Sequence, residues 1–404
     1  MNELTKTENG MNRSVLILAA LALAALAVAG FNERGWRMAA VAGIGAVAGV
    51  ALYHAAFGFT GAWRRMVRER RGAGLRAQML LIALACVITF PLMAWGRQIG
   101  LPATGNILPI GLAAALGAFM FGVGMQLGGG CASGTLFVLG GGSGRMLLVL
   151  AFFVAGSYWA TAHWDFWATL PRTRAGWSLP RNLGTGPGLA AMLAFLGLIA
   201  LISARIERRR HGGLEPPRTT GSWLRGPWPL VAGAVVLAAV SVAVMAVTGR
   251  PWGITAGFAL WGGKIAAAIG LPVDSSYWAP GWRQAQLEAS VLHNFTSVMN
   301  FAIVIGAVSA AAVAGKFRPT LSLSRRDVLT AVIGGLLMGY GARLAYGCNI
   351  GAFLGGMVSG SLHGAWWLVW GFLGSILGTW LRGRIGMDPP VAWRAASASR
   401  AAAS

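Results

Sequence analysis

Charged residues, and acidic residues above all, are scarce in this 404-residue sequence. Asp and Glu together number 11, and only 11% of the residues are charged, against about 25% in soluble globular domains. Because 56% of the residues are hydrophobic, the chain lacks the polar side chains to cover a globule in water, and most of its exterior must face lipid. The shortage of carboxylates also leaves little from which to build a proton relay inside a membrane.

Cysteine is rare as well, and several catalytic patterns are missing. Three cysteines are too few for a disulfide framework. The sequence has no Walker motif to bind ATP, and His54, His163, His293 and His363 do not stand at metal-ligand spacing from a cysteine or an acid. No paired carboxylates and no Ser-His-Asp order stand out. We therefore expect a protein that is not an enzyme and holds no cofactor and no metal.

Apolar runs long enough to cross a bilayer recur along the whole chain. We predict an all-α, polytopic membrane protein with about ten spans, the first of them retained rather than removed as a signal peptide. The predicted spans are 15–30, 38–57, 77–96, 108–127, 145–163, 186–204, 229–248, 289–314, 328–346 and 363–381.

The net charge of +22 comes from arginine and lysine clusters, and their placement argues against nucleic-acid binding. The clusters lie at 64–76, 205–225, 316–326 and 382–384. If ten spans alternate in direction, all four clusters fall on one side, as the positive-inside rule requires of cytoplasmic loops. We therefore place the protein in the cell inner (cytoplasmic) membrane, with the lipid bilayer as its surroundings and both termini in the cytoplasm.

A basic stretch at 205–227, with Pro and Gly and no apolar periodicity, divides the chain. We predict a polar N-terminal tail at 1–14, a first membrane half at 15–204, a cytoplasmic linker at 205–227, a second membrane half at 228–382 and a C-terminal tail at 383–404.

The two halves share a glycine-rich segment that contains a cysteine. A shift of 217 residues places Cys131 on Cys348, and seven of the eighteen positions 117–134 are then identical to their counterparts. Such self-similarity indicates internal repetition. Counting spans from a cytoplasmic N-terminus gives the two copies opposite directions, so we predict inverted repeats, the arrangement of many transporters.

The glycines beside the cysteines suggest a break in each repeat at membrane depth. Gly130 and Gly134 flank Cys131, and Gly347 and Gly351 flank Cys348. Each glycine inside a helix costs about 1 kcal/mol relative to alanine, so we expect re-entrant half-helices that carry the cysteines. Free N–H groups at the start of a half-helix favour an anion, and a thiol is polarizable. The alternative interpretation is close helix packing by small residues.

Two polar residues complete the candidate substrate-binding set. Arg343 lies five residues before Cys348, and Asn349 follows it directly. An arginine near membrane depth usually faces protein or water, so Arg343 either attracts an anion or serves as a structural contact. Asn349 either lines a path or makes an interhelical hydrogen bond. Cys86 lacks glycine neighbours, and we interpret it as a small residue that faces lipid or the core.

The segments 342–353 and 128–134 resemble the YeeE/YedE family of sulfur-transport membrane proteins, and the resemblance extends over most of 38–382. It implies uptake of thiosulfate or a related sulfur-containing anion, with Cys131 and Cys348 contacting the anion in turn. It also implies that a small cytoplasmic sulfur-carrier protein receives the sulfur. Many members have a third cysteine, but the matching stretch 57–64 has Gly58 in that place.

Other functions remain open at this stage. A membrane sulfurtransferase would use the same cysteines as nucleophiles. A related transporter would carry another sulfur or selenium species. In a helical scaffold the cysteines would have no functional role.

Overall fold

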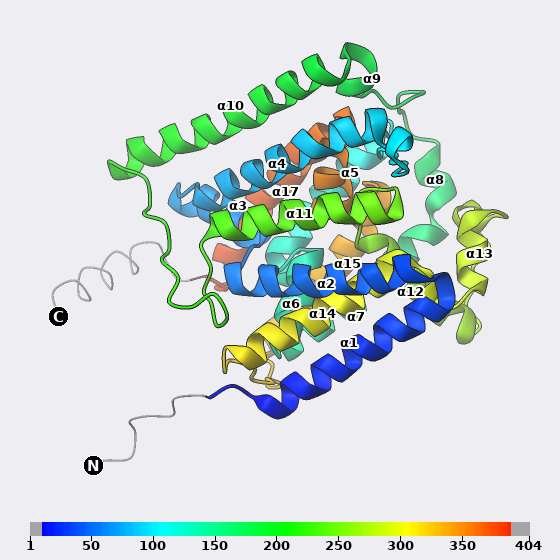
Figure 1. Cartoon of the computed structure of the whole chain (residues 1–404), viewed down its shortest axis with the longest axis horizontal. Helices are drawn as coiled ribbons and strands as arrows, with labels where there is room; N and C mark the ends of the chain where they lie inside the picture. The colour runs from blue at the N-terminus through cyan, green and yellow to red at the C-terminus, as the bar shows by residue number, and fades with distance from the viewer. Residues whose placement is uncertain (1–9, 389–404) are drawn as a thin grey trace.

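The apolar runs form long helices that lie side by side in the computed structural model, which describes residues 10–388 (Figure 1). Within that range, ten helical segments are long and apolar enough to cross a membrane. The long helices are α1 (Arg13–Arg34), α2 (Trp36–Ala55), α4 (Ala73–Trp95), α5 (Leu112–Gly128), α7 (Gly144–Ala162), α10 (Thr185–His211), α11 (Leu230–Thr248), α14 (Phe295–Val313), α15 (Arg325–Leu344) and α17 (Leu362–Arg384). Each matches a predicted span, so the prediction of an all-α, polytopic membrane protein is confirmed. Residues 1–9 and 389–404, in the predicted tails, lie outside the described range.

Shorter helices lie between the long ones. They are α3 (Phe59–Glu69), α6 (Ala132–Gly140), α8 (Trp164–Ala168), α9 (Leu179–Leu183), α12 (Thr255–Ala268), α13 (Trp282–Glu288), α16 (Gly355–Met357), the 3-10 turns η1 (Gly96–Ile99), η2 (Ser276–Trp278) and η3 (Val291–His293), and the π-helix η4 (Asn349–Leu354). In Figure 1, α3 and the connection after α10 lie at one end of the bundle, which we call the basic face, while α8 and α13 lie at the other, the aromatic face. Helix α10 continues to His211, through the first residues of the predicted linker.

The contacts between helices repeat in the two halves. Helix α5 packs against α15 and α17, while α15 packs against α5 and α7. Helix α2 packs against α14 and α11, and α4 packs against α11. The outermost helices follow the same rule, since α1 contacts α14 and α10 contacts α4, at opposite edges of Figure 1. The repeat is therefore an arrangement of five spans, with α1, α2, α4, α5 and α7 corresponding to α10, α11, α14, α15 and α17.

Glycines at the junction of α5 and α15 show that the two copies run in opposite directions. A Cβ on Gly117 would lie 2.6 Å from the carbonyl oxygen of Gly341, and one on Gly124 would lie 2.9 Å from that of Gly334. Gly334 and Gly341 are themselves the counterparts of Gly117 and Gly124, shifted by 217. Gly117 therefore contacts the counterpart of Gly124, and Gly124 contacts the counterpart of Gly117. This exchange requires that α5 and α15 run antiparallel and are related by a two-fold axis. Five spans per repeat give the same inversion.

The two repeats differ in length by one residue near their ends. In the first repeat, the N-cap serine of the next long helix is Ser143, which follows Cys131. In the second repeat it is Ser361, which lies one residue farther from Cys348. The extra residue is accommodated in η4, where the N–H of Phe353 donates to the carbonyl oxygen of Cys348 at 3.3 Å, five residues back. Single π-helical turns of this kind are frequent at functional sites.

Candidate functional site

Each of the two repeated cysteines begins a short helix after a break. Cys131 is the N-cap of α6, and Cys348 is the N-cap of η4, both in extended backbone. Both thiols are free and buried, with exposed fractions of 1% and 0%. The break in the helix at each cysteine is therefore seen, while a re-entrant path through the membrane stays a prediction.

The two cysteine segments meet inside the bundle. Helix α6 contacts η4, and both thiols belong to one continuous buried core. The inverted repeats thus bring to one place two cysteines that are 217 residues apart in sequence.

The predicted site glycines permit a tight turn just before each short helix. A Cβ on Gly130 would lie 3.1 Å from the amide nitrogen of Thr135, and one on Gly347 would lie 2.9 Å from that of Ala352. These partners are equivalent in the two repeats, so each glycine makes the same close approach to its short helix. Gly134 lies beside the sulfur, since a Cβ there would be 3.5 Å from Cys131 Sγ. Glycine here brings the backbone close to the thiol.

The second thiol lies at the start of η4, whose first turn contains Asn349, Ile350 and Gly351. Neighbouring Asn349 is fully buried, and both polar atoms of its side chain lack a hydrogen-bond partner among the described residues. Because an unpaired buried amide is costly, Asn349 is placed to bind a polar group that enters the site.

The Arg343 side chain contacts residues outside the two cysteine segments. Its Nη1 donates to Tyr277 Oη and its Nη2 to Thr255 Oγ1, both at 2.9 Å. Its counterpart, Gln126, likewise donates from Nε2 to the carbonyl oxygen of Thr60 at 3.1 Å. Both residues hold the start of a short helix, α12 and α3 respectively. Arg343 thus has a structural contact, while its buried Nε lacks a partner in the described chain.

A cavity of about 270 Å³ leads from the basic face to Cys131. We call it the basic cavity. The glycines Gly58, Gly129, Gly130 and Gly134 line it near the thiol, and Arg64, Arg65, Arg71 and Arg218 lie toward its rim. Glu215 and Glu69 pair with Arg65, and Glu207 pairs with Arg71. Two of the lining arginines, Arg65 and Arg71, are thus paired with carboxylates.

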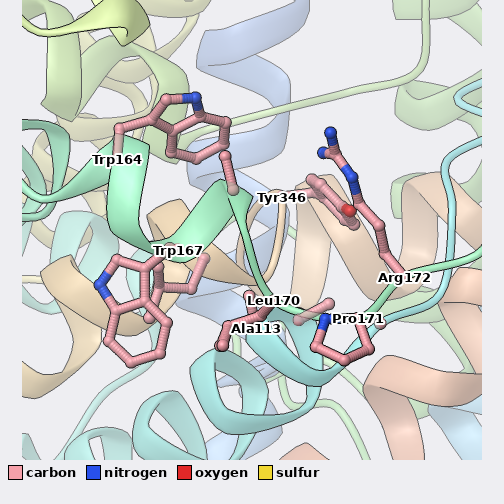
Figure 2. A pocket seen from close by; sticks show the side chains of 11 residues that line it. Ala113, Trp164, Trp167, Leu170, Pro171, Arg172 and Tyr346 are labelled. Carbon is pink, nitrogen blue, oxygen red and sulfur yellow. The ribbon is translucent and has the colours of Figure 1, made fainter.

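A smaller pocket of about 20 Å³ lies toward the aromatic face, and we call it the aromatic pocket (Figure 2). Trp164, Trp167, Arg172 and Tyr346 line it. Tyr346 is two residues before Cys348. Sequence reasoning did not single out Tyr346 or Arg172, although the repeat alignment places Tyr346 opposite Gly129 and could have marked the difference.

Two residues outside the site set have contacts that explain their presence. Cys86 is fully buried, and its Sγ lies 3.5 Å from the carbonyl oxygen of Met357 in α16. Lys264 Nζ donates to the carbonyl oxygens of Leu287 and Ala289 at 2.6 and 2.5 Å, and burial lowers the pKa of this amine. Lys264 therefore ties α12 to the connection after α13.

Gly58 occupies a position that would accept a cysteine. Its backbone is extended, a Cβ there would meet no atom within 4 Å, and the residue lines the basic cavity with Cys131. We expect Gly58→Cys to change the free energy of unfolding by no more than about 0.5 kcal/mol. A membrane-impermeant thiol reagent added to the basic face should label the new cysteine.

The matched control is Gly43→Cys in α2, an exposed position with equally open space that faces lipid. We expect this thiol to resist the same aqueous reagent. Equal labelling of both variants would contradict the assignment of Gly58 to a water-filled cavity.

Comparison with known proteins agrees with this architecture. A family model described as Sulphur transport matches residues 54–377. The chain is 28% identical over 348 residues to "Thiosulfate transporter TsuA" of Spirochaeta thermophila, a match that covers 83% of this chain and 95% of that protein. It is 25% identical over 351 residues to "Thiosulfate transporter TsuA" of Escherichia coli, covering 83% and 91%.

A third match is partial. The chain is 30% identical over 168 residues to "Probable transporter YedE" of Escherichia coli, and this segment is 42% of the chain and 40% of that relative's length. These matches confirm the family resemblance seen in the cysteine segments.

Proposed function

This chain belongs to the sulphur transport family, and from that premise we propose that it carries thiosulfate, or a related anion with a terminal sulfur, across the membrane. The observation that carries the proposal is the meeting of two buried, free cysteines at the two helix breaks, one of them open to the basic cavity. The full-length relatives named as thiosulfate transporters support the choice of anion.

The chemistry of the site suits a soft anion. Thiosulfate has charged oxygens at one end and a polarizable sulfur at the other. Backbone N–H groups at a helix start and the Asn349 amide would bind the oxygens, while the thiols contact the sulfur. Gly130, Gly134, Gly347 and Gly351 let the anion approach the backbone closely, and Arg343 would act through the position of α12.

We propose that the anion passes from Cys348 to Cys131 and then into the basic cavity. Each step exchanges one thiol contact for the next, and no covalent bond forms or breaks. On this account the protein is a transporter rather than an enzyme. The basic face would be the cytoplasmic side of the inner membrane, which places both termini there. A small sulfur-carrier protein would receive the sulfur at that face.

The membrane potential opposes the entry of a dianion. The cost is about 2.3 kcal/mol per charge for each 100 mV, or roughly 4–5 kcal/mol in all. With only 11 Asp and Glu in the chain, we propose facilitated passage, drawn inward by consumption of the sulfur in the cytoplasm.

Uptake by purified protein in liposomes tests the proposal. We expect radiolabelled thiosulfate to accumulate inside, and excess unlabelled thiosulfate to compete with it. Sulfate, which has the same charge and no terminal sulfur, should compete weakly. Equal competition by sulfate would contradict recognition through the thiols, and uptake no faster than in empty liposomes would contradict the transport function.

A further inference from the structure

The two cysteine turns share a residue with left-handed backbone at equivalent positions, but its side chain differs. Gly129 and Tyr346 are counterparts at a shift of 217, and both have positive φ, of 86° and 63°. Glycine adopts this left-handed region freely, whereas a bulky aromatic residue rarely does. The second repeat thus keeps the left-handed turn and places a large side chain there, although this backbone conformation disfavours such a side chain.

The difference coincides with a difference in the cavities near the two thiols, both of which are buried. Beside Gly129 the basic cavity is open, and both Gly129 and Cys131 line it. At the equivalent place in the second repeat, the half-buried Tyr346 side chain lines the small aromatic pocket. Cys348 is fully buried behind this turn.

The Tyr346 ring is held by contacts from several elements. It lies edge-on to the His363 ring of α17, with centroids 6.1 Å apart, and beside the Arg172 side chain, with Trp164 and Trp167 across the pocket (Figure 2). His363 Nδ1 is 2.8 Å from Ser361 Oγ, and its buried Nε2 lacks a partner in the described chain. The aromatic pocket lies beside the ring, which lines it.

We propose that Tyr346 is the gate on the aromatic face, and that its side chain closes the route to Cys348 while the basic cavity leaves Cys131 open. The structure is then the state open to the basic face. Movement of the Tyr346 ring would admit an anion to Cys348 and Asn349. The identity of that anion rests on the proposed function, but the gate itself does not.

Thiol labelling tests the gate without any substrate. A membrane-impermeant thiol reagent is added to the aromatic face of the protein in oriented vesicles, and the labelling rate of each cysteine is read by peptide mass spectrometry. Tyr346→Gly restores the residue of the other repeat and relieves the left-handed conformation. We expect the labelling rate of Cys348 to rise roughly tenfold, as when an open state grows from about a tenth of the population to most of it.

Tyr346→Phe is the matched control, because it keeps the ring and removes only the hydroxyl. Labelling of Cys348 should stay near the wild-type rate. An unchanged rate in Tyr346→Gly, or an equal rise in both variants, would overturn the gate.

The reciprocal variant, Gly129→Tyr, places the ring in the first repeat, where the Arg145 guanidinium must shift to admit it. We expect slower labelling of Cys131 from the basic face. An unchanged rate would overturn the proposal as well. A protein that passes these tests yet fails to take up thiosulfate would refute the proposed substrate and leave the gate intact.

Discussion

Cys348→Ala is expected to lower thiosulfate uptake by roughly ten- to hundredfold. A hydrogen bond to a charged group contributes about 1.5–3 kcal/mol, and about 1.4 kcal/mol corresponds to a tenfold change in affinity. Alanine leaves the fold nearly unchanged, but it removes the thiol at the point where η4 begins. Cys131→Ala should have an effect of the same size, because the thiols act in sequence. Initial uptake rates in liposomes, corrected for the amount of reconstituted protein, measure both.

Cys86→Ala is the control for these substitutions. Cys86 is as buried as Cys348, but it contacts a carbonyl oxygen in α16 and lies outside the two repeated cysteine segments. Its replacement should leave uptake within about twofold of wild type, in keeping with a stability change of no more than about 1 kcal/mol. Full uptake by Cys348→Ala, or equal losses in all three variants, would contradict a specific role for the paired cysteines.

Gly334→Leu is expected to destabilise the fold by about 3 kcal/mol, the upper part of the usual range for overpacking. A Cβ at this position would lie 2.3 Å from the amide nitrogen of Gly128 and 2.9 Å from the carbonyl oxygen of Gly124. Both atoms belong to the backbone of α5, so the two helices would have to separate. Unfolding in detergent, followed by tryptophan fluorescence, gives the change in the free energy of unfolding.

Gly197→Leu supplies the comparison for this packing prediction. Gly197 is an exposed residue of α10, and a Cβ there would meet no atom within 4 Å. We expect little loss of stability, since leucine favours a helix more than glycine does. Similar stability of the two variants would refute the close contact between α5 and α15 and, with it, the two-fold relation of the repeats.

The spans and the repeat could be predicted from sequence because both depend on regular patterns. Ten apolar runs gave ten helical segments in the described chain, and the shift of 217 that matched Cys131 with Cys348 also matches the glycines between α5 and α15. Opposite direction followed from the number of spans. The identity of each helix partner could not be predicted, because no sequence pattern records which glycine contacts which backbone.

Departures from the repeat were harder to predict than the repeat itself. The extra residue before Ser361 is accommodated in the π-helix η4, and the Asn349 side chain has no hydrogen-bond partner among the described residues. Both features depend on hydrogen bonding in three dimensions. Arg343 was expected either to attract an anion or to be a structural contact, and its bonds to Tyr277 and Thr255 depend on segments far apart in sequence. The lining of the basic cavity includes Arg64 from α3 and Arg218 from the connection after α10, two segments far apart in sequence.

Protection of the thiols by substrate tests the central claim most directly. Purified protein is treated with a small thiol reagent in rising concentrations of thiosulfate, with sulfate as the matched anion, and the alkylation rates of Cys131 and Cys348 are read in the same samples. We predict that thiosulfate slows alkylation of both cysteines with the same half-protecting concentration, while sulfate protects neither. Protection of one cysteine alone, or of neither, would contradict a single pathway in which both thiols contact the anion.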